Sequence, residues 1–342
     1  MQRDREGALV TTAAAGASAV DFGTHGDYRV KAPPRADGAF VRPLYQFQGR
    51  VSADGSTGYP AEAGRYHLYI SLACPWAHRS AIVRALLGLE DVVSMSVVDP
   101  VRDGRGWAFR DGPGYTPDPV NGFTLLRDAY QVTEPGYDGH VSVPVLWDKE
   151  TGQIVSNNFP DITIDLETQF GRWADPAFDL YPAALRPDID ALNERIYATV
   201  NNGVYRCGFA TSQEAYDSAV GSLFATLDDL DQRLATQRYL FGDSLTEADV
   251  RLWVTLARFD AVYVTHFKAN LRRLADYPNL WPYARDLYSI PAFGGTTDFG
   301  HIKRHYYGTH PQLNPLRIVP AGPVLDWDAP QRRAAVAGLG TR

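Results

Sequence analysis

The chain has 342 residues, which predicts two domains at roughly 150 residues per domain. Hydrophobic residues make up 45% of it and aromatic residues 12%, a composition that can bury a sizeable core and is not typical of disorder. The formal net charge is -7, and no cluster of Lys and Arg interleaved with aromatic residues marks a nucleic-acid surface. The charged first ten residues lack the apolar stretch of a secretory signal, and no segment has the roughly 18 uninterrupted apolar residues of a membrane span. We therefore expect a globular protein that binds neither nucleic acid nor membrane.

The first elements in chain order are an arm, a strand and a helix. Residues 1–64 are predicted to form an irregular arm, with an edge element within 40–48, because Gly, Pro and Asp recur and no periodic apolar face persists. Apolar and polar residues alternate over 65–73, which predicts a strand with one buried face. A helix over 75–87 should follow, with an apolar stripe and with Gly88 at the position of a C-cap glycine.

The next elements complete a mixed α/β unit. A second strand over 92–99 should pair with the first in parallel, through a right-handed crossover. The long loop from Pro100 to Phe123 is predicted to carry function, because such loops are uncommon inside compact domains. A helix over 124–133, a strand over 141–148, a turn, a strand over 153–158 and a further helix follow. The order βαβαββα predicts a thioredoxin-like domain over residues 65–172.

Four later segments predict an all-helical domain over residues 185–310, because each carries apolar residues at three- and four-residue spacing. They span 186–205, 212–236, 245–267 and 279–290. Thr246 and Asp249 have the spacing of a capping box. The Pro- and Gly-rich tail, 311–342, is expected to run over the surface. The predicted fold class is therefore α/β plus all-α.

Cys74 is the residue best suited to chemistry. It stands between the first strand and the first helix, and Pro75 occupies the first helical position, which tolerates a missing N–H. The sulfur should face unpaired N–H groups and the positive end of the helix dipole, so we predict a lowered pKa and a reactive thiolate. The alternative is the buried, inert thiol typical of a free cysteine. Ala77 stands where a dithiol oxidoreductase has its second cysteine, so a mixed disulfide on Cys74 would need an external thiol to resolve it.

The remaining cysteine and the histidines predict no metal site. Cys207 is interpreted as a small core residue, and two cysteines form neither a disulfide framework nor, alone, a zinc site. This cysteine usage favours a reducing, cytoplasmic compartment. His301 and His305, four apart beside a predicted loop, are interpreted as surface or core residues. The other histidines are scattered.

A proline also points to the site. Pro144 precedes a strand that should pair with the Cys74 region, where a proline removes a ladder hydrogen bond. A cis peptide between Val143 and Pro144 would turn the Val143 backbone towards a ligand. The alternative is a trans proline on an edge strand.

Several stretches together resemble the glutathionyl-hydroquinone reductases, the Xi class of glutathione transferases. They are the run over 65–100 and, in order, VSVPVLWDKETGQIVSN, VNNGVYRCGFATSQEAYD, LTEADVRLWVTLARFDAVYVTHFK and NPLRIVPAGP. The resemblance covers roughly residues 40–325. It implies a thioredoxin-like domain followed by an all-helical one, glutathione as co-substrate and a homodimer.

The resemblance also implies a reaction and its residues. In the family, a cysteine thiolate attacks the sulfur of a glutathionyl-hydroquinone, hydroquinone leaves, and a second glutathione releases the enzyme as glutathione disulfide. Cys74 would be this nucleophile, Trp107 would pack on the thiol, and Val143 before Pro144 would give it backbone hydrogen bonds. The aromatic product would lie against three tyrosines: Tyr205, Tyr263 and Tyr306. Their hydroxyls could stabilise the departing phenolate.

Three positions depart from the family pattern, and all concern the thiol. Asn158 and Phe159 stand where glutamate and serine are usual, and His140 stands where arginine is usual. These replacements remove two charge-assisted contacts to the ends of glutathione. Asn and His suit a polar, less charged thiol, for which mycothiol is the candidate. The alternative is that glutathione binds through neighbouring side chains.

Two other functions stay open at this point. A conjugating transferase would activate a bound thiol towards an electrophile, but such enzymes usually have Ser or Tyr at the position of Cys74. A non-catalytic interaction module is the second alternative, because fold does not dictate function. The retained cysteine at the helix start counts against both.

Overall fold

The computed structural model describes residues 16–29, 36–330 and 333. Its first domain is built on a four-stranded sheet in the order β2-β1-β3-β4. The strands are β1 (Tyr66–Ile70), β2 (Ser94–Val97), β3 (Val145–Asp148) and β4 (Gln153–Ser156). β1 pairs with β2 in parallel and with β3 antiparallel, and β3 and β4 form a hairpin. The predicted thioredoxin-like order of strands is confirmed.

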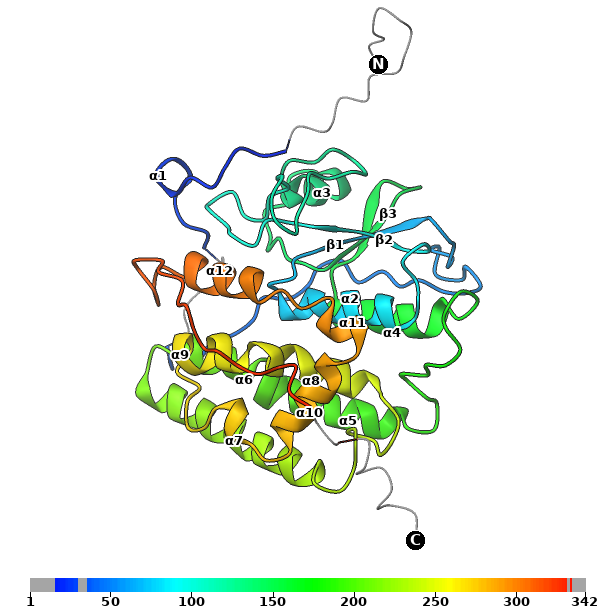
Figure 1. Ribbon diagram of the computed structural model, residues 1–342. Helices are drawn as coiled ribbons and strands as arrows, with labels where there is room; N and C mark the ends of the chain where they lie inside the picture. Colours follow the sequence, from blue (N-terminus) through cyan, green and yellow to red (C-terminus); the bar gives the residue numbers. More distant parts are fainter. Residues whose placement is uncertain (1–15, 30–35, 331–332, 334–342) are drawn as a thin grey trace, which may run out of the picture.

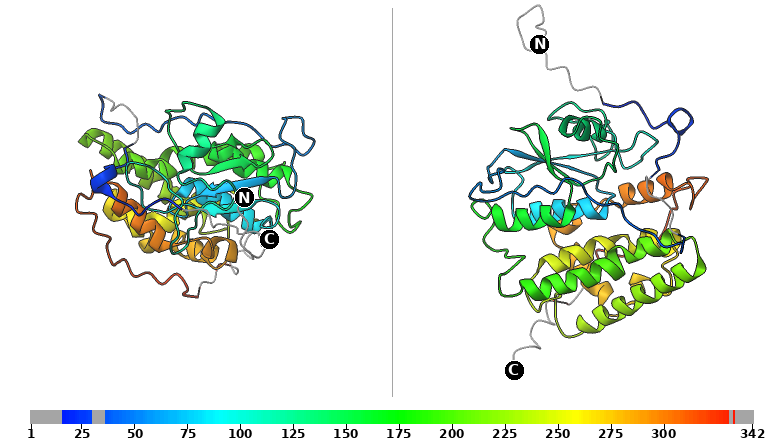
Figure 2. Two further views of the ribbon diagram at one scale, coloured as in Figure 1. Left: turned by 90° about the horizontal axis from the view of Figure 1, so that it is seen from above. Right: turned by 180° about the vertical axis from the view of Figure 1, so that it is seen from behind.

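Helices cover both faces of this sheet. α2 (Pro75–Leu86) and α4 (Phe159–Gln169) lie on the face towards the helical domain, and α3 (Leu126–Thr133) lies on the other (Figures 1 and 2). Because α2 lies between the sheet and the helical domain, most of its residues are buried. These include the polar side chains of His78, Arg79 and Ser80. His78 and Arg79 hydrogen-bond to Thr296 and Asn201 of the helical domain, whereas the Ser80 hydroxyl has no partner among the described residues.

The second part of the chain is helical, as predicted. Its main helices are α5 (Arg186–Ile196), α6 (Gly203–Gly208), α7 (Gln213–Arg233), α8 (Glu247–Arg258), α10 (Leu280–Tyr288), α11 (Pro291–Gly294) and α12 (Phe299–Thr309). The capping box of Thr246 and Asp249 is present at the start of α8. π-Helical turns at Tyr197–Asn201 and Phe259–Tyr263 follow α5 and α8, the latter leading into the short α9 (Val264–His266). The apolar spacing of the sequence did not indicate these interruptions. The domain limits given above remain a proposal.

Helix α12 was not predicted, and the placement of His301 and His305 beside a loop is wrong. Both lie within α12 and are buried. The His301 ring donates from Nε2 to the carbonyl of Pro113 at 2.7 Å, and the His305 ring from Nδ1 to that of Pro100 at 2.7 Å. α12 therefore ties the helical domain to the long loop after β2.

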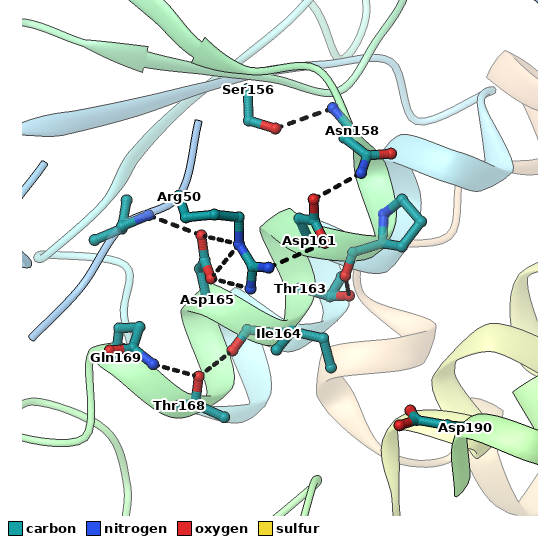
Figure 3. Close-up of polar contacts among 12 residues, drawn as sticks. Arg50, Ser156, Asn158, Asp161, Thr163, Ile164, Asp165, Thr168, Gln169 and Asp190 are labelled. Atoms are coloured by element: carbon teal, nitrogen blue, oxygen red, sulfur yellow. Dashed lines mark hydrogen bonds and ion pairs between the residues drawn. The ribbon is translucent and has the colours of Figure 1, made fainter. Parts of the chain in front are cut away.

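The arm and the tail both pack on the domains. Within the arm, α1 (Phe22–His25) is helical, and Gln48 bridges Ser156 beside β4, which confirms the edge element. Arg50 of the arm pairs with Asp165 of α4 (Figure 3). In the tail, Trp327 packs against Trp253. No helix within 16–29 or 36–330 has both the length and the apolar character needed to cross a membrane.

Candidate active site

A cavity of about 710 Å³ is lined by both domains and by the arm, a size typical of small-molecule sites. The sheet domain contributes Cys74, Trp107, His140 and Val143, among others. The helical domain contributes Tyr205, His305 and Tyr306, and the arm contributes Tyr28, Arg42 and Tyr45. The structure thus brings together six of the residues named from the sequence: Cys74, Trp107, His140, Val143, Tyr205 and Tyr306.

Cys74 is the N-cap residue of α2, directly before Pro75 at the first helical position. Its side chain is 9% exposed, on the wall of the cavity. The thiol donates to the carbonyl of Val143, with Sγ and O 3.6 Å apart. The peptide bond between Val143 and Pro144 is cis, as predicted. Cys74 therefore contacts the turn before β3.

The predicted lowering of the Cys74 pKa is wrong. Burial is the largest influence and raises the pKa of the thiol above its ordinary value. The N–H groups of Ala77 and Trp76 and the charges of Arg258 and Arg42 lower this pKa, but together they offset less than burial adds. The helix terminus acts in the expected direction; the domain interface that buries the sulfur outweighs it.

We expect the alkylation of Cys74 by iodoacetamide to be slow at pH 7 and to accelerate with pH beyond the ordinary thiol pKa of about 8.5. The reason is that a raised pKa leaves little thiolate at neutral pH. The measurement is the pH dependence of the alkylation rate. It is made in a Cys207→Ala background, because the buried Cys207, with a pKa of about 12, would otherwise add its own alkylation at high pH. A rate that reaches its plateau by pH 7 would contradict this expectation.

Trp107, His140 and Val143, the residues predicted to bind the thiol, all line the cavity. The ring of Trp107 stacks on His305 of α12, with centroids 5.1 Å apart. His140 Nδ1 lies 3.3 Å from the hydroxyl of Tyr28. Burial and then the charges of Arg102 and Arg42 lower the pKa of His140 to about 4. His140 is therefore neutral at pH 7 and supplies no positive charge to a ligand.

Asn158 and Phe159 do not line the cavity, and Pro144 is absent from its wall as well. The Asn158 side chain donates from Nδ2 to the carboxylate of Asp161 at 2.7 Å, within the first turn of α4 (Figure 3). Phe159 is buried, with its ring 4.5 Å from that of Trp76. A direct contact of Asn158 or Phe159 with the thiol, as predicted, has no counterpart in this geometry. Phe159 instead supports Trp76 behind the cavity.

The three predicted tyrosines form one hydrogen-bonded group. The hydroxyl of Tyr306 lies 2.5 Å from that of Tyr205 and 2.9 Å from that of Tyr263. Tyr205 and Tyr306 line the cavity, whereas Tyr263 lies behind them. Burial raises the pKa of each of the three. All three hydroxyls therefore keep their protons at physiological pH and can act as donors.

Several cavity residues had no signal in the sequence. Arg42, from the arm, places its guanidinium 4.5 Å from the ring centroid of Trp76 and 4.6 Å from that of Tyr205. Arg102, from the long loop, lies 3.9 Å from the ring of Tyr28 and 4.4 Å from that of Trp107. Both arginines stand in segments without regular structure, so no periodicity marked them.

Arg258, at the end of α8, connects the helical domain to the loop that carries Cys74. It is fully buried and donates to the carbonyls of Leu72 at 2.7 Å and Ala73 at 3.0 Å. It also donates to the carbonyl of Val254 at 2.8 Å. One guanidinium thus fixes the two residues before Cys74 from the other domain.

Comparison with known proteins places this fold and site in a family. The family model of the glutathione S-transferase N-terminal domain matches residues 73–169, and that of the C-terminal domain matches residues 213–286. The chain is 49% identical over 303 residues to the glutathionyl-hydroquinone reductase YqjG of Escherichia coli, covering 86% of this chain and 92% of that protein.

Solved structures agree. The glutathione S-transferase Xi of Phanerochaete chrysosporium has a TM-score of 0.83 and 48% identity, covering 86% of this chain and 96% of that chain. The glutathione-bound structure of YqjG has a TM-score of 0.82 and 49% identity, covering 84% and 96%. The chain belongs to the glutathione S-transferase family. Within that family, the predicted resemblance to the Xi class of glutathionyl-hydroquinone reductases is confirmed.

Proposed function

We propose that the protein is a thiol-dependent reductase. It removes the S-linked thiol substituent, such as a glutathionyl group, from S-conjugated hydroquinones through a mixed disulfide on Cys74. The observation that carries the proposal is the position of Cys74. Its sulfur stands at the start of α2, on the wall of a cavity that it shares with the hydroxyls of Tyr205 and Tyr306. Ala77 offers no second thiol, so the mixed disulfide persists until an external thiol arrives.

The reaction balances in two steps. One phenol of the conjugate first shifts to its keto tautomer, so that its hydroxyl proton moves to the ring carbon that bears sulfur. The Cys74 sulfur then attacks the sulfur of the conjugate, an S–S bond forms, the bond from sulfur to that carbon breaks, and its electron pair is taken up by the carbonyl, which becomes the phenolate of the hydroquinone. The proton of the Cys74 thiol ends on the released hydroquinone. A second thiol then attacks the mixed disulfide, leaves as the low-molecular-weight disulfide and returns its proton to Cys74. Because burial raises the Cys74 pKa, the thiol still carries this proton when it meets the conjugate, and the proton is transferred as the phenolate forms.

The tyrosine group supplies a proton donor for this phenolate. Three hydroxyls hold three protons, and the two hydrogen bonds among them use two. One proton is left over; when Tyr263 donates to Tyr306, this proton lies on Tyr205 or Tyr306 and can be donated into the cavity. Such a donor in a buried site stabilises developing negative charge.

We expect Tyr306→Phe to lower kcat for hydroquinone release by about 10- to 100-fold, because it removes the hydroxyl that joins the other two. Tyr263→Phe is the matched control, since Tyr263 is as buried as Tyr306 and hydrogen-bonds to it but does not line the cavity. Its kcat should stay within about fivefold of the wild-type value. Equal effects of the two substitutions, or no effect of either, would contradict this role.

The identity of the thiol is the finer part of the proposal. Glutathione is supported by the glutathione-bound structure of the YqjG relative. Mycothiol is the second candidate, favoured by the neutral His140. The test is hydroquinone release from glutathionyl- and mycothiolyl-hydroquinones, each with its matching free thiol. Release with one pair identifies the co-substrate; release with neither would overturn the reductase proposal.

The compartment and the assembly belong to the proposal as well. Two cysteines, both free, are compatible with a reducing, cytoplasmic location. A homodimer is carried over from the family alone. In the part of the chain that the structure describes, no three His, Cys, Asp or Glu side chains gather as a metal site, and the mechanism above calls for no metal.

A further inference from the structure

Arg102 is a buried cation on the wall of the cavity. Its side chain is 8% exposed, and its Nε has no hydrogen-bond partner. No carboxylate pairs with it within 16–29, 36–330 or 333. Its guanidinium packs against the rings of Tyr28 and Trp107. A guanidinium withdrawn from water without a counter-charge is costly.

The two arginines that follow in the same loop have acidic partners. Arg105 pairs with Asp103 at 2.7 Å, and Arg110 pairs with Asp99 at 2.6 Å. The loop therefore provides acids for its other cations and none for Arg102. Since Arg102 alone among the three lines the cavity, its missing partner is expected in the ligand.

We propose that Arg102 forms an anion-binding subsite and takes a carboxylate of the thiol co-substrate. This inference rests on the proposed function and specifies its ligand. Contact with two aromatic rings holds the guanidinium in place by cation–π attraction. Its N–H groups remain available for the paired hydrogen bonds that carboxylates accept from arginine.

The charges around the cavity favour an acidic ligand. His140 is neutral, as shown above, so it cannot take the place of Arg102. Arg42 donates through Nε to Asn202 at 3.1 Å, and its Nη2 has no partner. Asp27 is the one acid among the described residues that line the cavity, and it pairs with Arg317. The cavity wall therefore carries more positive than negative side chains. This excess favours glutathione, with two carboxylates, over a carboxylate-free thiol such as mycothiol.

Binding measurements test the inference independently of turnover. S-methylglutathione and its diethyl ester differ in their carboxylates and contain no thiol that could react with Cys74. By calorimetry, the wild-type protein should bind the free acid about 10- to 100-fold more tightly than the ester. In Arg102→Gln this preference should fall to near unity through weaker binding of the acid. Arg102→Lys, which keeps the charge without the fork, should keep part of it.

Arg110→Gln is the matched control, because it removes a buried arginine of the same loop that is paired and lies outside the cavity. It should lower the melting temperature and leave the preference for the acid unchanged. Arg102→Gln should lower the melting temperature less than Arg110→Gln does, since the cation it removes has no acidic partner among the residues that the structure describes. Equal binding of acid and ester by the wild type, or an unchanged preference in Arg102→Gln, would overturn the subsite. Failure to release hydroquinone while the preference holds would overturn only the reductase proposal.

Discussion

Replacing Cys74 with serine is expected to lower the rate of hydroquinone release by about 10³-fold or more. A serine hydroxyl cannot form a disulfide with the sulfur of the conjugate, so the first covalent step is lost. Serine fits the space of cysteine at the N-cap of α2 and is a favoured N-cap residue, so the fold should persist. The measurements are the release rate and, by mass spectrometry, the thiol adduct on residue 74.

The control for this substitution is Cys207→Ala. Cys207 is buried in α6 outside the cavity, and its protonated thiol has no part in the mechanism. The variant should retain activity within about twofold and form the same adduct on Cys74. Wild-type activity in Cys74→Ser would remove the reductase proposal and would favour the conjugating transferase, in which a hydroxyl at this position activates the bound thiol.

The fold was predictable wherever local pattern and tertiary structure agree. The strand β1, the proline after Cys74 and Gly88 at the end of the first helix all express backbone preferences that neighbouring residues share. The alternation over β1 was wrong about burial, because helices cover both faces of the sheet and all five residues of the strand are buried. α12 escaped because the residues it buries include His301 and His305. The carbonyls of Pro113 and Pro100 accept from these two rings and so permit their burial, and those partners lie 188 and 205 positions away in the sequence.

The residues of the site also fall into two groups, those that local sequence constraints predict and those that tertiary packing alone positions. Cys74 and the cis proline could be derived from local constraints, and the tyrosines were reached through the resemblance. Arg42 and Arg102 come from an arm and a loop whose paths are fixed by packing across both domains, so no local rule located them. The direction of the Cys74 pKa depends on burial at the domain interface, which the sequence of α2 alone does not contain. The local sequence therefore indicated Cys74 but not the charged side chains of Arg42 and Arg102 around it.

The second large effect is expected from Arg258→Met. The substitution leaves the carbonyls of Leu72 and Ala73 without their side-chain donor, and each buried acceptor left unpaired costs about 1–3 kcal/mol. We expect the free energy of unfolding to fall by about 3–5 kcal/mol, measured by chemical denaturation. Arg195→Gln is the control, because Arg195 pairs with Asp229 on the surface and such pairs contribute at most about 1 kcal/mol.

Arg258→Lys separates positioning from stability. A lysine keeps the positive charge in the domain interface, but its compact ammonium lacks the planar fork that spans the carbonyls of Leu72 and Ala73. The loop should then shift relative to α2, and a displacement of about 1 Å at a reacting atom can lower kcat about 100-fold. We therefore expect Arg258→Lys to lower kcat at a temperature where the variant is fully folded, with KM for the conjugate changed less. An unchanged kcat in that variant would mean that Arg258 only stabilises the interface, and that the position of Cys74 is set within the sheet domain alone.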